Sequence, residues 1–315
     1  MNICILDAAT LGEDLSLKLF DQFGNVTVYK STPPELIAQR LQDAHVAILN
    51  KAKLNADNLK DASQLKLICL TATGYDNVDL SYCRAHGIAV CNVVGYSTQC
   101  VSQLTVAMAL SLITNLSEYN RFVSSGEYSA CGCANRLTPV FHEIAGKTWG
   151  IVGYGNIGKQ VAQVAEALGC HVLVHKRVPV EGVNCRDFET LCKESDILSF
   201  HTPLNDGTRH MLDEEHISML KPSAIVINVA RGAVTDEAAL AKALMEDRIG
   251  GLGVDVYSTE PMPDDHPFAK ILNHPRICLT PHMAWGGYET RVRLLDEVAL
   301  NIESFLNGDR RCRVD

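Results

Sequence analysis

The sequence predicts an α/β protein with two parallel-sheet domains and a cleft between them. Strand-like and helix-like segments alternate along nearly the whole chain, and its 315 residues are too many for one small core. A glycine-rich turn between a strand and a helix occurs in the middle of the chain, whereas the N-terminal third has no such turn. We therefore expect one sheet to hold a nucleotide, and clefts between two domains commonly hold substrates.

The N-terminal third alternates short apolar strands with helix-like segments, as a parallel sheet covered by helices does. The expected strands cover residues 2–6, 26–29, 46–49, 65–70 and 88–90. A long helix rich in Val, Ala, Leu and Met is then expected over 98–115, and a less regular stretch over 117–138. Near the C-terminus a further helix is expected over 289–306, after a break at Gly286-Gly287.

The middle of the chain has the pattern of a Rossmann dinucleotide-binding unit. A buried strand is expected over 148–152, a helix over 159–168 and a second strand over 171–175. The turn after the first strand consists of Gly153, Tyr154, Gly155, Asn156, Ile157 and Gly158. In this G-x-G-x-x-G spacing the first glycine permits a tight turn, the second lets a pyrophosphate approach the backbone, and the third lets helix and strand pack closely. Because all parts occur in register, they favour a nicotinamide dinucleotide site over a glycine-rich turn of another kind.

The end of the second strand favours NADP(H) over NAD(H). An acid at this position would bond the adenosine ribose 2′-hydroxyl and would repel a 2′-phosphate. The chain has Lys176 and Arg177 there instead. Two cations can pair with a phosphate dianion, and arginine can do so through two hydrogen bonds. NAD(H) remains possible if both side chains are only solvated charges at a strand end.

Three later strands end in loops whose side chains suit a carboxylate with an adjacent carbonyl. Strands are expected over 196–200, 224–229, 251–256 and 277–280. The loops after the last three carry Arg231, Glu260 and His282, and such sheets bind ligands at the carboxyl ends of their strands. Arginine offers a fixed fork for the carboxylate, histidine can donate a proton near neutrality, and a glutamate beside it favours the imidazolium form. Each residue alone has a structural explanation, so only the combination favours catalysis.

Composition excludes several classes of partner. A hydrophobic content of 47% with 21% charged residues is typical of a globular protein, and a net charge of −9 argues against nucleic acid and anionic membranes. No signal peptide is expected, since Met1 leads directly into a strand, and the most apolar helix candidate, 106–113, is far too short to span a bilayer. The 12 cysteines are scattered, and the one close pair, Cys131 and Cys133, is poorly spaced for zinc. We expect reduced thiols in a cytoplasmic protein and no metal site.

The whole chain resembles the D-isomer-specific 2-hydroxyacid dehydrogenase family, and within it the glycerate dehydrogenases and hydroxypyruvate/glyoxylate reductases. The motifs that carry the resemblance are the glycine turn, Val229 to Gly232, 255–261, Thr280 to His282, 71–79 and Asn50-Lys51. The resemblance implies an NAD(P)-dependent enzyme that reduces hydroxypyruvate or glyoxylate to the D-2-hydroxy acid. It also implies a flavodoxin-like substrate domain made of residues 1–98 and 286–315, and a Rossmann domain made of residues 99–285.

The resemblance implies roles for the matching residues. Arg231 would bind the substrate carboxylate, His282 would protonate the carbonyl oxygen, and Glu260 would pair with His282. Asp255 would bond the nicotinamide carboxamide. Further cofactor contacts would come from Thr202, Pro203 and Ala230.

The first domain would contribute backbone N–H groups of Thr73 and Gly74 to the carboxylate. Lys51 could reach the substrate or be a solvated lysine, and Trp285 could line the pocket of a short substrate or serve packing. In place of the family's usual acid after the second strand the chain has Lys176, which puts NAD specificity in doubt. The relatives dimerise through the region that corresponds to 98–138, so a homodimer is expected.

Other activities remain open at this point. A lactate-type reduction of pyruvate differs from the leading prediction by one small group on the keto acid, and phosphoglycerate oxidation is less expected. A dinucleotide-sensing, protein-binding module of the same fold would keep the same three residues. Turnover of a small keto acid distinguishes the enzymes from the sensor.

Overall fold

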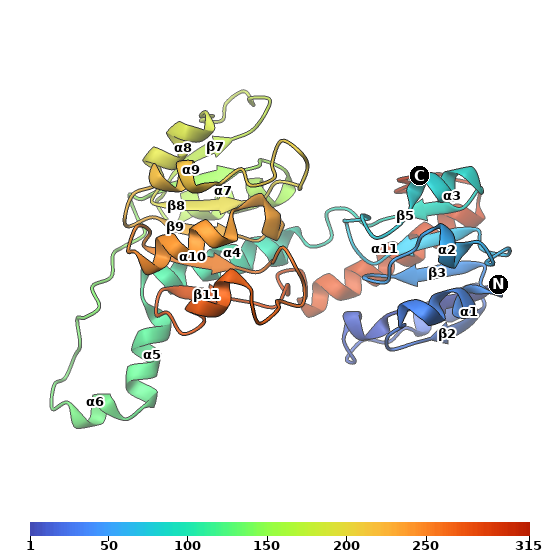
Figure 1. Cartoon of the computed structure of the whole chain (residues 1–315), viewed down its shortest axis with the longest axis horizontal. Coiled ribbons are helices and arrows are strands. Elements are labelled where there is room, and N and C mark those ends of the chain that lie inside the picture. The colour runs from blue at the N-terminus through green and yellow to red at the C-terminus, as the bar shows by residue number, and fades with distance from the viewer. The chain divides into compact units, whose positions relative to one another are not determined.

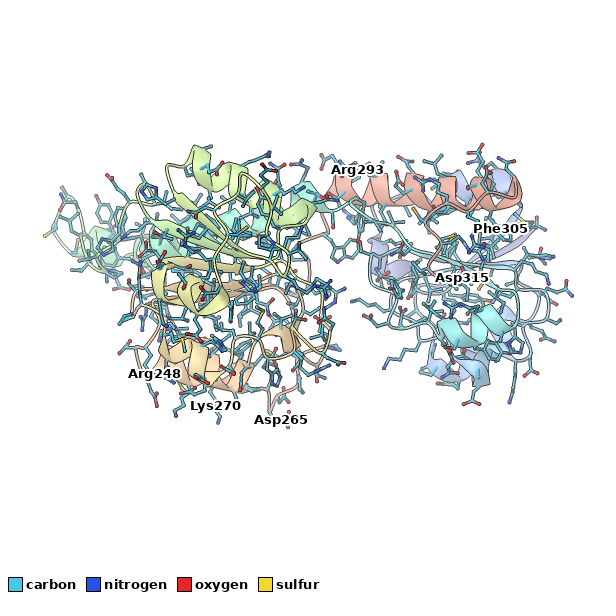
Figure 2. All side chains as sticks on the ribbon, turned by 90° about the horizontal axis from the view of Figure 1, so that it is seen from above. Arg248, Asp265, Lys270, Arg293, Phe305 and Asp315 are labelled. Carbon is cyan, nitrogen blue, oxygen red and sulfur yellow. The ribbon has the colours of Figure 1, made fainter.

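The computed structural model describes all 315 residues and divides into two compact units (Figure 1). The first unit consists of Met1–Ser97 and Gly286–Asp315, and the second unit consists of Thr98–Trp285. The chain therefore leaves the first unit once and returns to it for its last helix, α11 (Tyr288–Leu306). Arg293 and Phe305 lie toward opposite ends of that helix (Figure 2).

The first unit contains a parallel sheet of five strands in the order β2-β1-β3-β4-β5, which is the flavodoxin-like order. The strands are β1 (Asn2–Ile5), β2 (Asn25–Val28), β3 (Val46–Leu49), β4 (Leu67–Leu70) and β5 (Ala89–Cys91). All residues of β3, β4 and β5 are buried, as expected for apolar strands that are covered on both faces.

Helices cover both faces of this sheet. One core contains alternate residues of the strands, such as Leu49 and Leu70, together with residues of three short helices. These helices are α1 (Ile37–Leu41), α2 (Ala56–Leu59) and α3 (Leu80–Ala85). Helix α11 contacts β4 but contributes nothing to that core, so it covers the opposite face. The remaining helical turns of the unit are η1 (Ala8–Leu11), η2 (Lys18–Phe23) and η3 (Pro34–Leu36).

The second unit contains a parallel sheet of six strands in the order β11-β10-β9-β8-β6-β7. The strands are β6 (Thr148–Val152), β7 (His171–His175), β8 (Ile197–Phe200), β9 (Ile225–Asn228), β10 (Gly251–Val254) and β11 (Ile277–Leu279). An isolated parallel bridge between Val174 and Cys185 extends the sheet beyond β7. The strand order reverses at β6, which has β7 on one side and β8 on the other, and this is the switch point at which a doubly wound sheet binds ligands.

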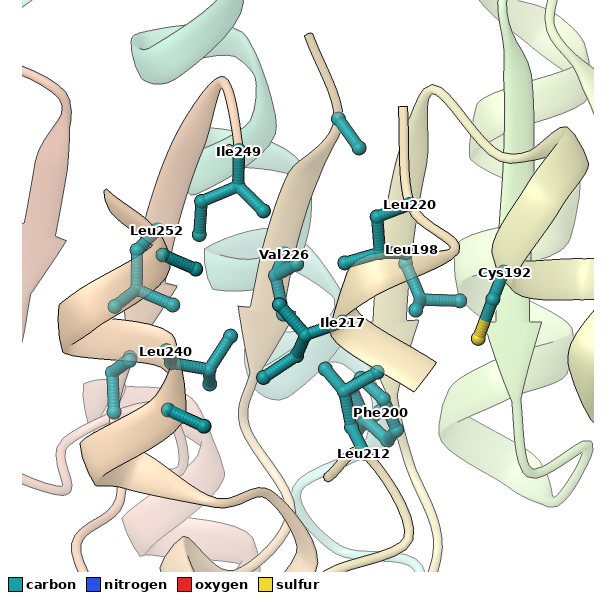
Figure 3. Close-up of a cluster of buried hydrophobic side chains, with 14 of the residues drawn as sticks. Cys192, Leu198, Phe200, Leu212, Ile217, Leu220, Val226, Leu240, Ile249 and Leu252 are labelled. Carbon is teal, nitrogen blue, oxygen red and sulfur yellow. The ribbon is translucent and has the colours of Figure 1, made fainter. Parts of the chain in front are cut away.

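Two cores lie on the two faces of the second sheet. One face is covered by α4 (Thr98–Ile113) and α7 (Asn156–Ala167), which also contact each other. The other face is covered by α8 (Phe188–Glu194), α9 (Glu214–Ser218) and α10 (Glu237–Met245). Figure 3 shows this second core, in which Leu198, Val226 and Leu252 of three neighbouring strands point toward helix residues such as Ile217 and Leu240. The short helical turns η4 (Gly232–Val234) and η5 (Pro267–Ile271) flank α10.

The structure corrects two expectations about helices. Helix α7 begins at Asn156, directly after Gly155, and not at residue 159, so Gly158 lies inside the helix. The stretch 117–138 was expected to be less regular, but it contains most of α5 (Leu116–Ser124) and all of α6 (Glu127–Ala130). An ion pair between Arg121 and Glu118, three residues apart at 2.9 Å, favours α5 although no residue of it is buried.

No single helix is long and apolar enough to cross a membrane, although α4 and α5 pass that criterion jointly across a 65° bend, and α4 packs on the second sheet. All 12 cysteines are free thiols, and Cys131 and Cys133 are the exposed ones.

Candidate active site

The glycine turn has the geometry that a bound pyrophosphate requires. Gly153 has φ +92°, and a Cβ there would lie 2.7 Å from the carbonyl oxygen of His201. A Cβ on Gly158 would lie 2.1 Å from the carbonyl oxygen of Gly153. In contrast, a Cβ on Gly155 would meet nothing within 4 Å, so this position alone faces open space. The turn is therefore closed where protein packs on it and open where a ligand would approach.

The first turn of α7 adds hydrogen-bond donors to this open space. Its N-cap is Gly155, which provides no side-chain acceptor, and the next residues are Asn156 and Ile157. The first N–H groups of a helix have no partner within the helix and lie at its positive end, so they suit an anion. Tyr154 is half-buried beside Lys159, whose Nζ lies 5.9 Å from the ring centroid.

The neighbouring loop after β8 supplies the other side of the switch point. His201 N–H donates to Val152 O at 2.7 Å, which places Thr202 and Pro203 directly beside the glycine turn. His201 Nε2 lies 2.9 Å from Ser199 Oγ, which in turn accepts the indole N–H of the buried Trp149 at 2.9 Å. Burial lowers the pKa of His201 to about 3, so this ring stays neutral and fixes the loop by hydrogen bonding. The N–H donors and the open space at Gly155 fit a dinucleotide at this switch point.

Lys176 and Arg177 follow β7 and are both exposed. Neither side chain forms an ion pair or a hydrogen bond within the chain. Both cations are therefore available to an anionic ligand.

His282 and Glu260 form the closest acid–base pair at the carboxyl edge of the second sheet. The ring Nδ1 donates to Glu260 Oε2 at 2.7 Å, and the two side chains are 26% and 28% exposed. The other oxygen of this carboxylate, Oε1, accepts the backbone N–H of Tyr257 at 3.1 Å. Because Nδ1 holds a proton in this contact, Nε2 remains for a substrate.

The turn that carries His282 is built around Asp255. His282 has φ +51°, in the left-handed region, and its backbone N–H donates to Asp255 O at 2.8 Å. The Asp255 carboxylate, only 1% exposed, accepts from Thr280 Oγ1 at 2.6 Å, Met283 N–H at 2.8 Å and Ala284 N–H at 3.0 Å. Burial raises the pKa of Asp255 despite these donors. Asp255 thus holds the His282 turn in a conformation that an isolated chain would rarely adopt.

Arg231 follows β9 and lies in a loop that packs against the Glu260 loop. The Asn228 side chain braces this loop, since it accepts from Ala230 N–H at 3.0 Å and donates to Arg231 O at 2.9 Å. A Cβ on Gly232 would lie 2.1 Å from Ser258 N, which shows how closely the two loops approach. The half-buried guanidinium makes one hydrogen bond within the chain, from Nη1 to Ala230 O at 2.8 Å. Most of its donors are therefore left for a ligand.

Trp285 is half-buried and ends the same segment. Its indole N–H donates to His282 O at 3.1 Å, and its ring packs against the core between the sheet and α4. The residue therefore supports the His282 turn by hydrogen bonding and by packing.

In the first unit, the loop after β4 presents free backbone donors. The N–H groups of Thr73 and Gly74 donate to no group within the chain. Their loop is fixed by the Thr73 hydroxyl, which donates to Val93 O at 2.7 Å, and by Asn92 Nδ2, which donates to Thr73 O at 2.7 Å. Two backbone N–H groups of a fixed loop are therefore available to an anionic ligand.

Lys51 is exposed in the loop after β3 of the first unit. The buried Asp7 carboxylate fixes this loop, because it accepts the backbone N–H groups of Asn50, Lys51 and Ala52 at 2.7 to 3.1 Å. The backbone at Lys51 is therefore held by three hydrogen bonds to one carboxylate.

A Rossmann unit that presents an arginine with free donors and a histidine–glutamate pair at the carboxyl edge of its sheet is typical of the nicotinamide-dependent oxidoreductases. Residues 106–284 match the family described as "D-isomer specific 2-hydroxyacid dehydrogenase, NAD binding domain". The chain belongs to the D-isomer-specific 2-hydroxyacid dehydrogenase family, whose enzymes act on a CH–OH group with a nicotinamide dinucleotide.

Individual relatives match almost the full length of the chain. A glycerate dehydrogenase of Methylorubrum extorquens is 38% identical over 307 residues, which cover 97% of this chain and 96% of the relative. A glyoxylate reductase of Thermococcus litoralis is 35% identical, with coverage of 93% and 91%. Among solved structures, a D-lactate dehydrogenase from Aquifex aeolicus, complexed with NAD and lactic acid, has a TM-score of 0.85 at 27% identity and coverage of 98% and 96%.

Sequence reasoning missed a second glutamate–histidine pair in this unit. Glu237 and His266 are both buried, and their side chains meet at 3.0 Å beside the Glu260 loop. Neither residue belongs to a recognisable catalytic spacing, and the two are 29 positions apart.

Proposed function

We propose that the chain reduces hydroxypyruvate or glyoxylate to the corresponding D-2-hydroxy acid, with NADPH as the preferred reductant. The observation that carries this proposal is the Glu260–His282 pair at 2.7 Å, held by a fixed turn beside the loop of an arginine with free donors. The names of the two similar relatives, a glycerate dehydrogenase and a glyoxylate reductase, support the substrate class.

In the proposed reaction each side chain has one task. Arg231 binds the substrate carboxylate through its fixed fork and polarises the adjacent carbonyl. His282 donates the proton at Nε2 to the carbonyl oxygen, and Glu260 stabilises the imidazolium before the transfer. The nicotinamide, when bound, supplies the hydride for the 2-keto carbon.

The residues proposed to hold the cofactor follow strands β6, β7, β8, β9 and β10. The pyrophosphate binds at Gly155 and the first turn of α7, where there is open space. Lys176 and Arg177 bind the 2′-phosphate, because both are exposed and unpaired within the chain. Thr202, Pro203 and Ala230 line the dinucleotide, and Asp255 bonds the carboxamide through lone pairs that its three backbone and hydroxyl donors leave over.

Initial rates with four substrate pairs test the proposal. Hydroxypyruvate and glyoxylate are each combined with NADPH and with NADH, and oxidation of the nicotinamide is followed by absorbance. We expect turnover of at least one keto acid and a higher kcat/KM with NADPH. Turnover of pyruvate in preference to both would indicate a lactate-type enzyme, and tight cofactor binding without any turnover would indicate a sensor.

We also propose a homodimer in the cytoplasm. The segment from α5 to β6 exposes large apolar side chains, including Leu137 at 72%, Val140 at 67% and Phe141 at 49%. Exposed apolar groups of this kind mark interaction surfaces, and unpaired thiols are typical of a reducing compartment. Light scattering at micromolar concentration tests the assembly, and a single monomeric species would contradict it.

A further inference from the structure

We propose that Glu237, together with His266, is a positioning residue that fixes the Glu260 loop and thereby sets how Glu260 acts on His282. This inference rests on the proposed function, since it concerns the same acid–base pair. It assigns a role to two buried polar side chains that otherwise have none.

Glu237 lies in the first turn of α10 and is only 8% exposed. Its carboxylate accepts three hydrogen bonds: from Ser258 N–H at 2.9 Å, from Ser258 Oγ at 2.5 Å and from His266 Nε2 at 3.0 Å. Burying a carboxylate without partners is costly, so a site with three donors to one side chain stabilises the loop that provides them.

His266 is 4% exposed and has a fixed tautomer. Its Nδ1 accepts the backbone N–H of Phe268 at 3.2 Å, so Nδ1 carries no proton in this arrangement. The ring proton is then on Nε2, where it faces Glu237. His266 therefore donates to the carboxylate as a neutral ring, at Oε2, the oxygen that also accepts the Ser258 hydroxyl.

Ser258 links this pair to the candidate active site. It stands two positions before Glu260, and the preceding residue, Tyr257, donates its backbone N–H to Glu260 Oε1 at 3.1 Å. Glu237 of α10 thus holds the loop at Ser258, and the Tyr257 N–H holds the Glu260 carboxylate at Oε1. The other carboxylate oxygen of Glu260, Oε2, binds His282.

Glu237 also connects this loop to the arginine. The chain runs from Arg231 through η4 to Glu237, and Gly232 packs directly on Ser258. A single buried carboxylate thereby ties the segment that carries Arg231 to the segment that carries Glu260.

The Glu260 loop also has a tyrosine and further acids around it, and these could influence the charge on Glu260 and His282. Burial, with the nearby charges of Asp255, Glu260, Cys278 and Glu237, raises the pKa of Tyr257 to about 12. Tyr257 therefore stays neutral, and its hydroxyl donates to Thr280 O at 3.0 Å. The acids that face the loop are Asp255, Glu237 and Glu260 themselves.

The experiment compares Glu237→Ala, Glu237→Gln and the milder Ser258→Ala with a matched control, Asp236→Ala. Asp236 is the N-cap of α10 and accepts from Ala239 N–H at 3.0 Å, so its loss destabilises the same helix start without touching Ser258. Two quantities are measured: the pH profile of kcat and KM for hydroxypyruvate reduction, and the NMR titration of the His282 C2–H resonance, assigned with His282→Gln.

We expect Glu237→Ala to lower kcat about tenfold, because it weakens the support of a general acid that is worth 10²- to 10⁴-fold. The KM for NADPH stays unchanged. The alkaline limb of kcat, which reports loss of the donated proton, and the His282 resonance move together to lower pH. Glu237→Gln restores part of the effect, since its amide oxygen still accepts Ser258 N–H. Asp236→Ala lowers the melting temperature but leaves both pH readouts in place.

The inference is overturned if Glu237→Ala, Glu237→Gln and Ser258→Ala all leave the His282 titration where Asp236→Ala leaves it. Glu260→Gln separates this failure from a failure of the proposed function. If Glu260→Gln moves the NMR titration but not kcat, the catalytic role of the pair is wrong, while the NMR data still decide whether Glu237 positions Glu260. A Glu237→Ala/Glu260→Gln double variant that titrates like Glu260→Gln alone supports the inference.

Discussion

The two oxygens of Glu260 serve different partners: Oε2 accepts from His282 Nδ1 at 2.7 Å, and Oε1 accepts from the backbone N–H of Tyr257 at 3.1 Å. The carboxylate is thereby bound to its own loop through one oxygen and to the ring through the other. His282 is fixed independently, since its backbone N–H donates to Asp255 O. Two separately braced loops thus present one histidine nitrogen, Nε2, to a ligand.

Replacement of His282 by Gln tests the proton-donor role. The variant keeps a polar side chain at the position but has no group that transfers a proton near neutrality, so kcat for keto-acid reduction should fall about 10²- to 10⁴-fold. Binding of NADPH, measured by fluorescence, should change little. His171→Gln, at an exposed histidine at the start of β7, is the control. A near-normal kcat in His282→Gln would show that another group supplies the proton.

Alanine substitutions at Gly155 and Gly158 should have different effects: the first should weaken cofactor binding, and the second should lower the stability of the fold. An added Cβ at Gly155 meets no protein atom within 4 Å and its φ of −86° suits alanine, so Gly155→Ala should keep its melting temperature but bind NADPH at least tenfold more weakly. An added Cβ at Gly158 lies 2.1 Å from a backbone oxygen, so Gly158→Ala should lose about 1–3 kcal/mol of unfolding free energy. Calorimetry and cofactor titration of both variants decide; equal melting temperatures would contradict the packing argument.

The fold class could be predicted from the sequence because its signals are local. Runs of Val, Ile and Leu bounded by turn residues mark strands such as β3 and β6, and the glycine spacing marks the nucleotide turn. The sequence alone predicts too late a start for α7, because glycine usually weakens a helix. Here Gly158 is needed inside the helix, since only a residue without Cβ lets α7 pack on Gly153 O.

The support of the site could not be predicted in the same way. Glu237 looks like an ordinary acid in the first turn of a helix, and His266 like an ordinary residue before a proline. Their contact joins α10 to η5 and exists only after the second unit has folded. Asp255 likewise gains its role from backbone N–H groups 28 and 29 positions later, which no local pattern shows.

Asp315 should make the stability of the first unit depend on pH. Burial alone would raise the pKa of this carboxyl, but hydrogen bonds from Arg313 and from the backbone N–H of Val90, with the Arg313 charge, lower it from 3.8 to about 2. Because the folded-state pKa is the lower one, the stabilisation is complete above 3.8 and is lost as the pH falls toward 2. Urea unfolding at several pH values should show Asp315→Asn less stable than the natural chain near neutrality, with the difference shrinking below pH 3.8. A difference that does not depend on pH would exclude this linkage.

Lys176 and Arg177 should decide between the two dinucleotides. Each cation can form a charge-assisted hydrogen bond with a 2′-phosphate, worth about 1.5–3 kcal/mol, and neither has a competing acid within the chain. Lys176→Ala/Arg177→Ala should therefore lower kcat/KM for NADPH at least tenfold and leave kcat/KM for NADH nearly unchanged. In the natural chain, the preference for NADPH over NADH should also weaken as salt is added, since exposed charges are screened. Lys193→Ala, which removes an exposed lysine paired with Glu189 on α8, is the control for a general loss of positive charge. Equal losses with NADPH and NADH would show that the two cations do not read the phosphate.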